Sequence, residues 1–219
     1  MILPSDQLYK QSKLIKLGKN KVKQEYLAII DWINFKYNVN VLNILLDYVI
    51  VAKEKLPRLY VVLEQSTDYN KFKKKPFIYD KVKQNKIKDH FLAFFDKEKI
   101  ENSDSLFVVF GNFEKVYYEE INESITKKDL NRIAYEIDKE NIWGISNMFD
   151  ATTVFYYSDS YLAKIDKVNI KDRISEKLFS LLKKKDQFGY CAIEKILIYF
   201  DTKENFDNNY QSNWYYYYK

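Results

Sequence analysis

The stretch Leu27–Asp47, LAIIDWINFKYNVNVLNILLD, decides how this chain is organised. Its first half repeats apolar residues at three- and four-residue steps, as an amphipathic helix does, and its second half has the β-branched content of a strand. A second stretch, Leu130–Asp150, reads LNRIAYEIDKENIWGISNMFD and aligns with the first without a gap when Leu27 is placed on Leu130. The alignment indicates one helix-and-strand unit that is used twice.

The residues after each stretch predict the same order of elements. In the first half, helices are expected at 21–37 and 80–95, and strands at 39–52, 58–64, 106–110 and 116–121. In the second half, Thr126 is expected to cap a helix that runs to about residue 139, with Asp129 completing a capping box. A second helix is expected at 169–185, and strands at 142–149, 152–165, 196–200 and within the C-terminal run QSNWYYYYK.

Strands that follow one another in pairs favour a mainly antiparallel sheet with helices on one face. The predicted fold class is therefore α+β, built as two tandem α-β-β-α-β-β repeats. Residues 1–20 form an N-terminal arm, loose or partly helical, residues 21–122 the first repeat and residues 123–219 the second, packed together as one globular domain. The strands LFVVF (106–110) and ILIYF (196–200) are continuous apolar runs and are expected to be buried. The alternative is a chance resemblance in a biased composition.

The composition is that of a globular protein, with 47% hydrophobic, 31% charged and 17% aromatic residues in 219. Among its 36 basic residues only Arg58, Arg132 and Arg173 are arginine. Abundant lysine, asparagine, isoleucine and tyrosine indicate AT-rich coding DNA and a bacterial source, so the net charge of +5 is weak support for a nucleic-acid partner. No signal peptide or membrane span is predicted, and a cytoplasmic location without membrane association is expected.

Catalytic and cofactor motifs are missing from the sequence. His90 is the single histidine and Cys191 the single cysteine, which argues against histidine triads, multi-histidine metal sites and disulfides. Glycine-rich phosphate loops and CxxC pairs do not occur, and the spacing of Asp201, Glu204 and Asp207 is not that of a calcium loop. We therefore expect no catalytic residue, no metal and no cofactor. An enzyme with carboxylates and tyrosines in a pocket is the least favoured alternative.

The C-terminal run NWYYYYK is the most unusual segment of the chain. Read as a strand, it would direct alternate side chains to opposite faces and expose one aromatic set. Aromatic residues with a polar end are frequent at protein interfaces. The predicted protein-binding residues are those of this run with the acidic residues before it: Asp201, Glu204, Asp207, Trp214, Tyr215, Tyr216, Tyr217 and Tyr218.

Two lysine-rich segments, Lys10–Lys23 and Lys71–Lys88, offer an alternative function, and aromatic residues interleave the second. Basic side chains with interleaved aromatic rings are typical of single-stranded nucleic-acid binding, and here Tyr69, Phe72, Phe77 and Tyr79 could supply the rings. The residues assigned to this alternative are Lys71, Lys73, Lys74, Lys75, Lys81 and Lys83. A solvated lysine-rich loop and helix face explains the same pattern.

The sequence favours a non-enzymatic protein that binds another protein, of unknown identity, through a tyrosine-rich sheet face or edge. Toxin-neutralising immunity proteins and defence-associated proteins of bacteria are classes of this kind, and the link is an analogy of class. Nucleic-acid binding through the lysine-rich segments is the alternative.

Overall fold

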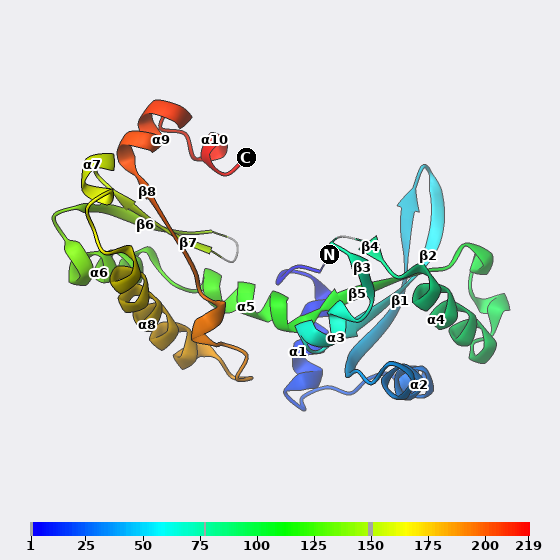
Figure 1. The fold of residues 1–219 in the computed structure, drawn as a ribbon. Helices are drawn as coiled ribbons and strands as arrows, with labels where there is room; N and C mark the ends of the chain where they lie inside the picture. Colours follow the sequence, from blue (N-terminus) through cyan, green and yellow to red (C-terminus); the bar gives the residue numbers. More distant parts are fainter. Residues whose placement is uncertain (1, 77, 149–150) are drawn as a thin grey trace. The chain divides into compact units, whose positions relative to one another are not determined.

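A computed structural model describes residues 2–76, 78–148 and 151–219 of the chain. Three residues named in the sequence predictions, Phe77, Phe149 and Asp150, lie outside these ranges. The chain mixes helices with several small sheets, which confirms an α+β fold, and divides into two compact units, Met1–Tyr117 and Tyr118–Lys219 (Figure 1). None of the helices in the described ranges combines the length and apolar character needed to cross a bilayer.

The first unit is built on a three-stranded sheet in the order β1-β2-β5. β1 (Val41–Val51) and β2 (Glu54–Leu63) form an antiparallel hairpin, and β5 (Phe107–Asn112) lies parallel to β2. A parallel neighbour requires a crossover connection, and α4 (Lys81–Phe94) lies within it. The sheet is thus mixed, whereas the sequence predicted it to be mainly antiparallel. Short elements complete the unit: α3 (Ser66–Asn70), β3 (Lys73–Lys75) and β4 (Ile78–Tyr79).

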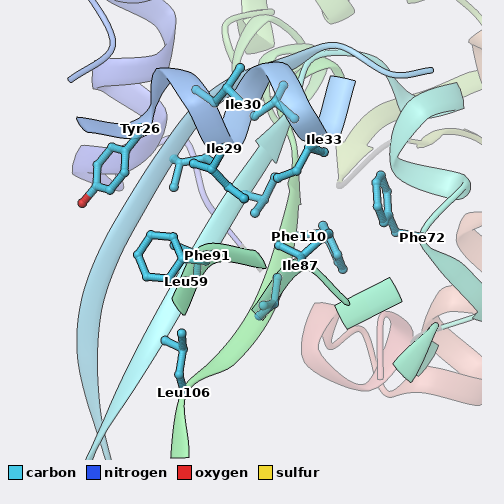
Figure 2. Close-up of a cluster of buried hydrophobic side chains, with 14 of the residues drawn as sticks. Tyr26, Ile29, Ile30, Ile33, Leu59, Phe72, Ile87, Phe91, Leu106 and Phe110 are labelled. Carbon is cyan, nitrogen blue, oxygen red and sulfur yellow. The ribbon is translucent and has the colours of Figure 1, made fainter. Parts of the chain in front are cut away.

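One face of this sheet carries the main core of the unit. α2 (Leu27–Tyr37) directs Ile29 and Ile33 at the strands (Figure 2), and these two side chains are almost fully buried, as is Ile30. Phe91 of α4 and Leu59 of β2 belong to the same cluster. Each such side chain contributes about 1.5–3 kcal/mol when it leaves water.

The opposite face is covered by α1 (Gln7–Lys16), at the N-terminal arm of the sequence prediction. The Asn43 amide donates to Ser12 Oγ of α1 over 3.2 Å, while its neighbour Ile44 belongs to the core under α2. Successive strand residues point to opposite faces, so α1 and α2 cover different faces of the sheet. The expectation of helices on one face is therefore wrong: three strands alone leave apolar residues on both faces that need cover.

The second unit has the same strand order, β6-β7-β8. β6 (Ile142–Met148) and β7 (Ala151–Tyr156) are antiparallel, and β8 (Leu197–Thr202) is parallel to β7. The helices of this unit are α6 (Lys127–Asp138), α7 (Asp159–Leu162), α8 (Lys167–Lys185), α9 (Lys203–Tyr210) and α10 (Trp214–Tyr217). α6 begins with the predicted capping box of Thr126 and Asp129.

The first strand of each sheet has an irregularity at its start, between Val41 and Asn43 in β1 and between Ile142 and Gly144 in β6. In this register Val41 corresponds to Ile142, because each pairs with the last residue of the following strand. The sequence alignment, which places Leu27 on Leu130, is therefore two residues out of register with the strand pairing.

Both predicted return strands are helices. Residues 116–121 lie within α5 (Phe113–Glu123), and the C-terminal tyrosines form α10. A polar side chain caps each of these helices: Asn112 Oδ1, at the end of β5, accepts from Lys115 N–H over 3.1 Å, and Asn213 Oδ1, just before α10, accepts from Tyr215 N–H over 2.9 Å. The turn expected at Gly111–Asn112 is likewise wrong, because both residues belong to β5.

Two further predictions, a connection and a strand, need correction. The connection expected at 53–57 is a tight turn at Ala52 and Lys53, whose φ angles are 50° and 73°, and Pro57 lies in β2. Pro57 is tolerated because the pairing of β5 with β2 begins only at Arg58, so no partner strand needs its missing N–H. The strand expected at 152–165 ends at Tyr156.

The predicted burial of ILIYF holds only for alternate residues: Ile196 and Ile198 are 6% and 7% exposed. Leu197 is 45% exposed and Tyr199 56% exposed, because β8 is an edge strand whose alternate side chains face water. LFVVF, of which residues 107–110 belong to β5, is better covered: Val108 and Phe110 are each 1% exposed.

Gly111 and Gly144 provide a matched test of packing. A Cβ at Gly111 would lie 2.9 Å from the Tyr60 ring and 3.0 Å from Ile2, whereas a Cβ at Gly144 would meet no atom within 4 Å. We expect Gly111→Ala to lower the free energy of unfolding by about 1–3 kcal/mol and Gly144→Ala to leave it unchanged. Urea denaturation of both variants measures the difference. Equal stability of the two variants would contradict the close packing at Gly111.

Candidate functional site

The C-terminal helix of the second unit packs on the sheet through aromatic side chains. Trp214 of α10 lies 4.3 Å from Phe206 of α9 and 6.0 Å from Trp143 of β6, measured between ring centroids. Phe155 of β7 completes the contact at 5.4 Å from Trp214. Aromatic pairs at these separations add to the free energy gained by burial. α10 is only four residues long, so these rings hold it in place.

Two tyrosine hydroxyl groups anchor the same helix. Tyr217 donates to Asp201 Oδ2 over 2.5 Å, and Tyr218 donates to Ser146 Oγ over 2.6 Å. Burial, and then the Asp201 carboxylate, raise the pKa of Tyr217 above its ordinary value of 10.0, so its hydroxyl stays protonated and remains a donor. α10 is therefore fixed both to β6 and to the end of β8.

Two cavities lie along β6 beside this helix, and we call them together the edge groove. The first has a volume of about 400 Å³ and the second of about 550 Å³. The first is lined by Lys127, Asn131, Trp143, Gly144, Ile145, Ser146, Asn147, Phe155 and Trp214. The second is lined by Ser146, Met148, Trp214, Tyr215, Tyr218 and Lys219. Because Ser146 and Trp214 line both, the cavities adjoin and follow β6 from Trp143 to Met148.

Gly144 opens the groove at the strand. Its φ angle is not positive, and an added Cβ would meet nothing within 4 Å, so neither backbone conformation nor crowding requires glycine here. A glycine inside a strand often marks a place where a ligand or another backbone approaches closely. Here the missing side chain leaves open space beside Trp143 and Trp214.

The predicted protein-binding residues fall into two groups. Trp214, Tyr215 and Tyr218 line the edge groove; Tyr216 is 47% exposed and lies outside the lining, and Tyr217 is turned toward Asp201. The alternation expected of a strand does not apply, because the run is helical.

The three acidic residues are engaged within the second unit. Asp201 accepts from Tyr217 and from the Asn205 amide, and Glu204 accepts from Asp159 N–H over 2.7 Å. Asp207 pairs with Lys203 and accepts from Ser212, contacts that lower the pKa of its carboxyl group. None of these three carboxylates lines the edge groove.

The sequence predictions missed the β6 wall and the two α6 residues of the groove, Lys127 and Asn131. Gly144 is the signal that could have found the wall, since it is a glycine in a predicted strand next to Trp143. No comparable signal marked Lys127, because lysine is common throughout the chain.

Three lysines assigned to the nucleic-acid alternative make contacts within the first unit. Lys71 Nζ donates to Asn38 O over 2.5 Å and Lys83 to Lys71 O, and Lys73 lies 4.5 Å from the centre of the Tyr69 ring. Lys74, Lys75 and Lys81 are exposed.

The rings required for base stacking face the protein. Phe72 is fully buried, and the Tyr69 and Tyr79 hydroxyl groups lie 3.2 Å apart. Tyr79 also donates to Phe110 O over 2.9 Å. These contacts leave the exposed lysines without stacking partners from Tyr69, Phe72 and Tyr79.

His90 and Cys191 have structural surroundings. The His90 ring stacks on Trp32 with centroids 3.9 Å apart, and partial burial lowers its pKa. Burial, with the nearby Asp186 carboxylate, raises the pKa of the Cys191 thiol to about 12, which makes the reactive thiolate scarce at neutral pH. Across the described ranges, no three histidine, cysteine or acidic side chains form a group that could hold a metal ion.

Comparison with protein-family models, with curated proteins and with solved structures finds no match to this chain.

Tyr217 and Tyr215 allow the anchoring of α10 to be tested with the same chemical change. We expect Tyr217→Phe to lower the free energy of unfolding by about 1.5–3 kcal/mol, because it removes a hydrogen bond to a carboxylate. Tyr215→Phe should change it by less than about 0.5 kcal/mol, because Tyr215 is 68% exposed. Equal effects in urea denaturation would contradict the anchor.

We expect the stability difference between the wild type and Tyr217→Phe to depend on pH. A raised Tyr217 pKa means that its stabilising contribution is complete below pH 10 and is lost as the pH rises further. The difference in stability between the wild type and Tyr217→Phe should therefore shrink above pH 10. A constant difference between pH 8 and pH 11 would contradict the bond to Asp201.

Proposed function

We propose that this protein is a non-enzymatic binding protein that holds another protein in the edge groove. The observation that carries the proposal is the pair of adjoining cavities on β6, walled by Trp143, Trp214 and Tyr215. Tyrosine and tryptophan provide large contact areas at low entropic cost and keep a polar end, and they are frequent among the residues that dominate binding energy at interfaces. Trp214 and Tyr215 are 43% and 68% exposed, so they present apolar area to a partner.

The chemistry of the site supports binding over catalysis. The Cys191 thiol has a high pKa, His90 is stacked on Trp32, and Asp201 is bonded to Tyr217. None of these three groups lines the edge groove. The groove lining supplies aromatic, amide and lysine side chains, which suit recognition of a protein segment.

For the biological role we propose a toxin-neutralising immunity or defence-associated protein of a bacterium, acting in the cytoplasm. The proposal rests on the AT-rich coding bias and on the class of small, motif-free binding proteins. Co-production with the product of a neighbouring gene tests it: rescue of cells from that product supports the role, and no effect on any neighbouring product contradicts it.

We also propose that the two units arose by duplication of one α+β repeat. Their sheets share strand order, strand directions and an irregularity at the start of the first strand. In addition, Ser66 N–H donates to Glu114 and Asp159 N–H donates to Glu204, so a glutamate early in the helix after the third strand has the same role in both units. Related sequences in which Glu114 and Glu204 vary without any relation to each other would count against a common origin.

Tyr215 and Tyr216 test the proposed binding surface as a matched pair. Both are exposed, but only Tyr215 lines the groove, so Tyr215→Ser should release a partner captured from the source cells and Tyr216→Ser should retain it. Both variants should keep the wild-type melting temperature. Binding of the purified partner, measured by calorimetry, should weaken about tenfold or more for Tyr215→Ser alone.

Two outcomes would contradict the assignment to the groove. Equal binding by both tyrosine variants would remove the groove as the interface. A salt-sensitive partner that is lost when Lys74, Lys75 and Lys81 are replaced by Gln, and kept by Tyr215→Ser, would assign the function to the lysine-rich segment and to nucleic acid.

A further inference from the structure

β6 is the outermost strand of its sheet, so one row of its main-chain N–H and C=O groups faces away from β7. Proteins usually protect such an edge with a charged side chain, a proline or a covering element. Residues 143–148 read WGISNM and contain neither charge nor proline. Within the described ranges, no side chain from outside the hairpin hydrogen-bonds to the β6 main chain.

The first unit shows how this chain protects an edge elsewhere. At β5, Gln84 Nε2 donates to Val108 O over 2.5 Å and Tyr79 donates to Phe110 O over 2.9 Å, so two successive outward carbonyls are occupied. At β1, Asp47 carries a charge that pairs with Arg58. β6 lacks both devices, and the edge groove lies along it.

We propose that an extended segment of the partner protein binds in the edge groove by adding a strand to β6. This inference rests on the proposed function and specifies its mode of binding. Main-chain hydrogen bonds to an open edge provide affinity that does not depend on sequence, and pockets for alternate side chains provide specificity. The run Gly144–Met148 is about 17 Å long at the usual rise per residue, which fits a segment of about five residues.

The lining of the groove defines the chemistry of that segment. Strand residues alternate between two faces, and the groove has a different wall on each face of β6. Trp143 and Trp214 form the wall on the α10 side, and Lys127 and Asn131 form the wall on the α6 side. An apolar or aromatic side chain fits the first wall, and the next side chain along the segment faces the second.

The charged groups of the lining are lysines. Lys127 and Lys219 line the groove, and among the lining residues that the structure describes none is acidic. Lys127 makes no ion pair with a carboxylate of the described residues. A partner segment with an acidic residue beside an aromatic one therefore complements the groove in both charge and shape.

A library of displayed random twelve-residue peptides tests the inference even though the partner is unidentified. Selection on the wild-type protein, with counter-selection on Gly144→Leu, should enrich peptides that carry an acidic residue one position from an aromatic one. Gly144→Leu fills the open space at the strand. Asn131→Trp fills the groove from an exposed helix position without altering the strand, and it replaces Gly144→Leu if that variant fails to fold.

Backbone N-methylation of an enriched peptide is the decisive measurement. Strand addition predicts that methylation at every second amide abolishes binding, because those amides donate to β6, and that methylation at the others is tolerated. Lys127→Gln should weaken binding about tenfold, while Lys128→Gln, its neighbour on the same helix, should not.

Three results would overturn the inference. Enrichment that is equally strong on the filled variants would mean that the peptides bind elsewhere. Methylation effects without a two-residue period would show that side chains alone are recognised, which leaves the proposed protein-binding function standing and removes strand addition. A wild-type dimer in sedimentation experiments that is lost in Gly144→Leu would assign the edge to a second copy of this chain.

Discussion

A three-stranded sheet has two faces and too few residues to bury either alone, and this constraint shapes both units. In the first, α2 and α4 cover one face with aliphatic and aromatic side chains, and α1 covers the other through Tyr9 and Ser12. In the second, α9 and α10 pack aromatic rings on the sheet. α10 has four residues, whereas α1 has ten. The edge groove lies where the short α10 meets β6.

Local signals in the sequence predicted the elements whose ends are marked by specific side chains. The capping box of Thr126 and Asp129 starts α6 as expected, and Asp80, the first residue of the helix predicted at 80–95, is the cap of α4. Both hairpins follow from their β-branched content. These predictions succeed because the deciding interactions lie within a few residues of one another.

The return strands could not be predicted in the same way. Residues 113–123 carry aromatic and β-branched residues that suit a strand, yet Phe113, Val116 and Tyr117 are buried at helical spacing. In the C-terminal run, adjacent tyrosines fit either period, and the choice depends on rings of Phe206 and Trp143 that are distant in sequence or in another element. Tertiary packing outweighed strand propensity in both cases.

The sequence predicted some residues of the candidate site, but the secondary structure that it predicted for them is not the one observed. Trp214, Tyr215 and Tyr218 line the groove, but as one side of a helix rather than as one face of a strand. The acidic residues predicted with them stabilise the fold around α9 instead. Lys127 and Gly144 come together only when α6 packs against β6. No local sequence pattern predicts this packing.

The order of these covering helices along the chain has a consequence for synthesis on the ribosome. α1 precedes the sheet that it covers, so the first unit has both of its covers available once β5 emerges. α10 follows every strand of the second unit, so the β6–β7 face remains uncovered until Trp214 and Tyr217 have left the exit tunnel. During that interval Trp143 and Phe155 are open to other chains, and the nascent second unit is the part of the molecule most in need of a chaperone.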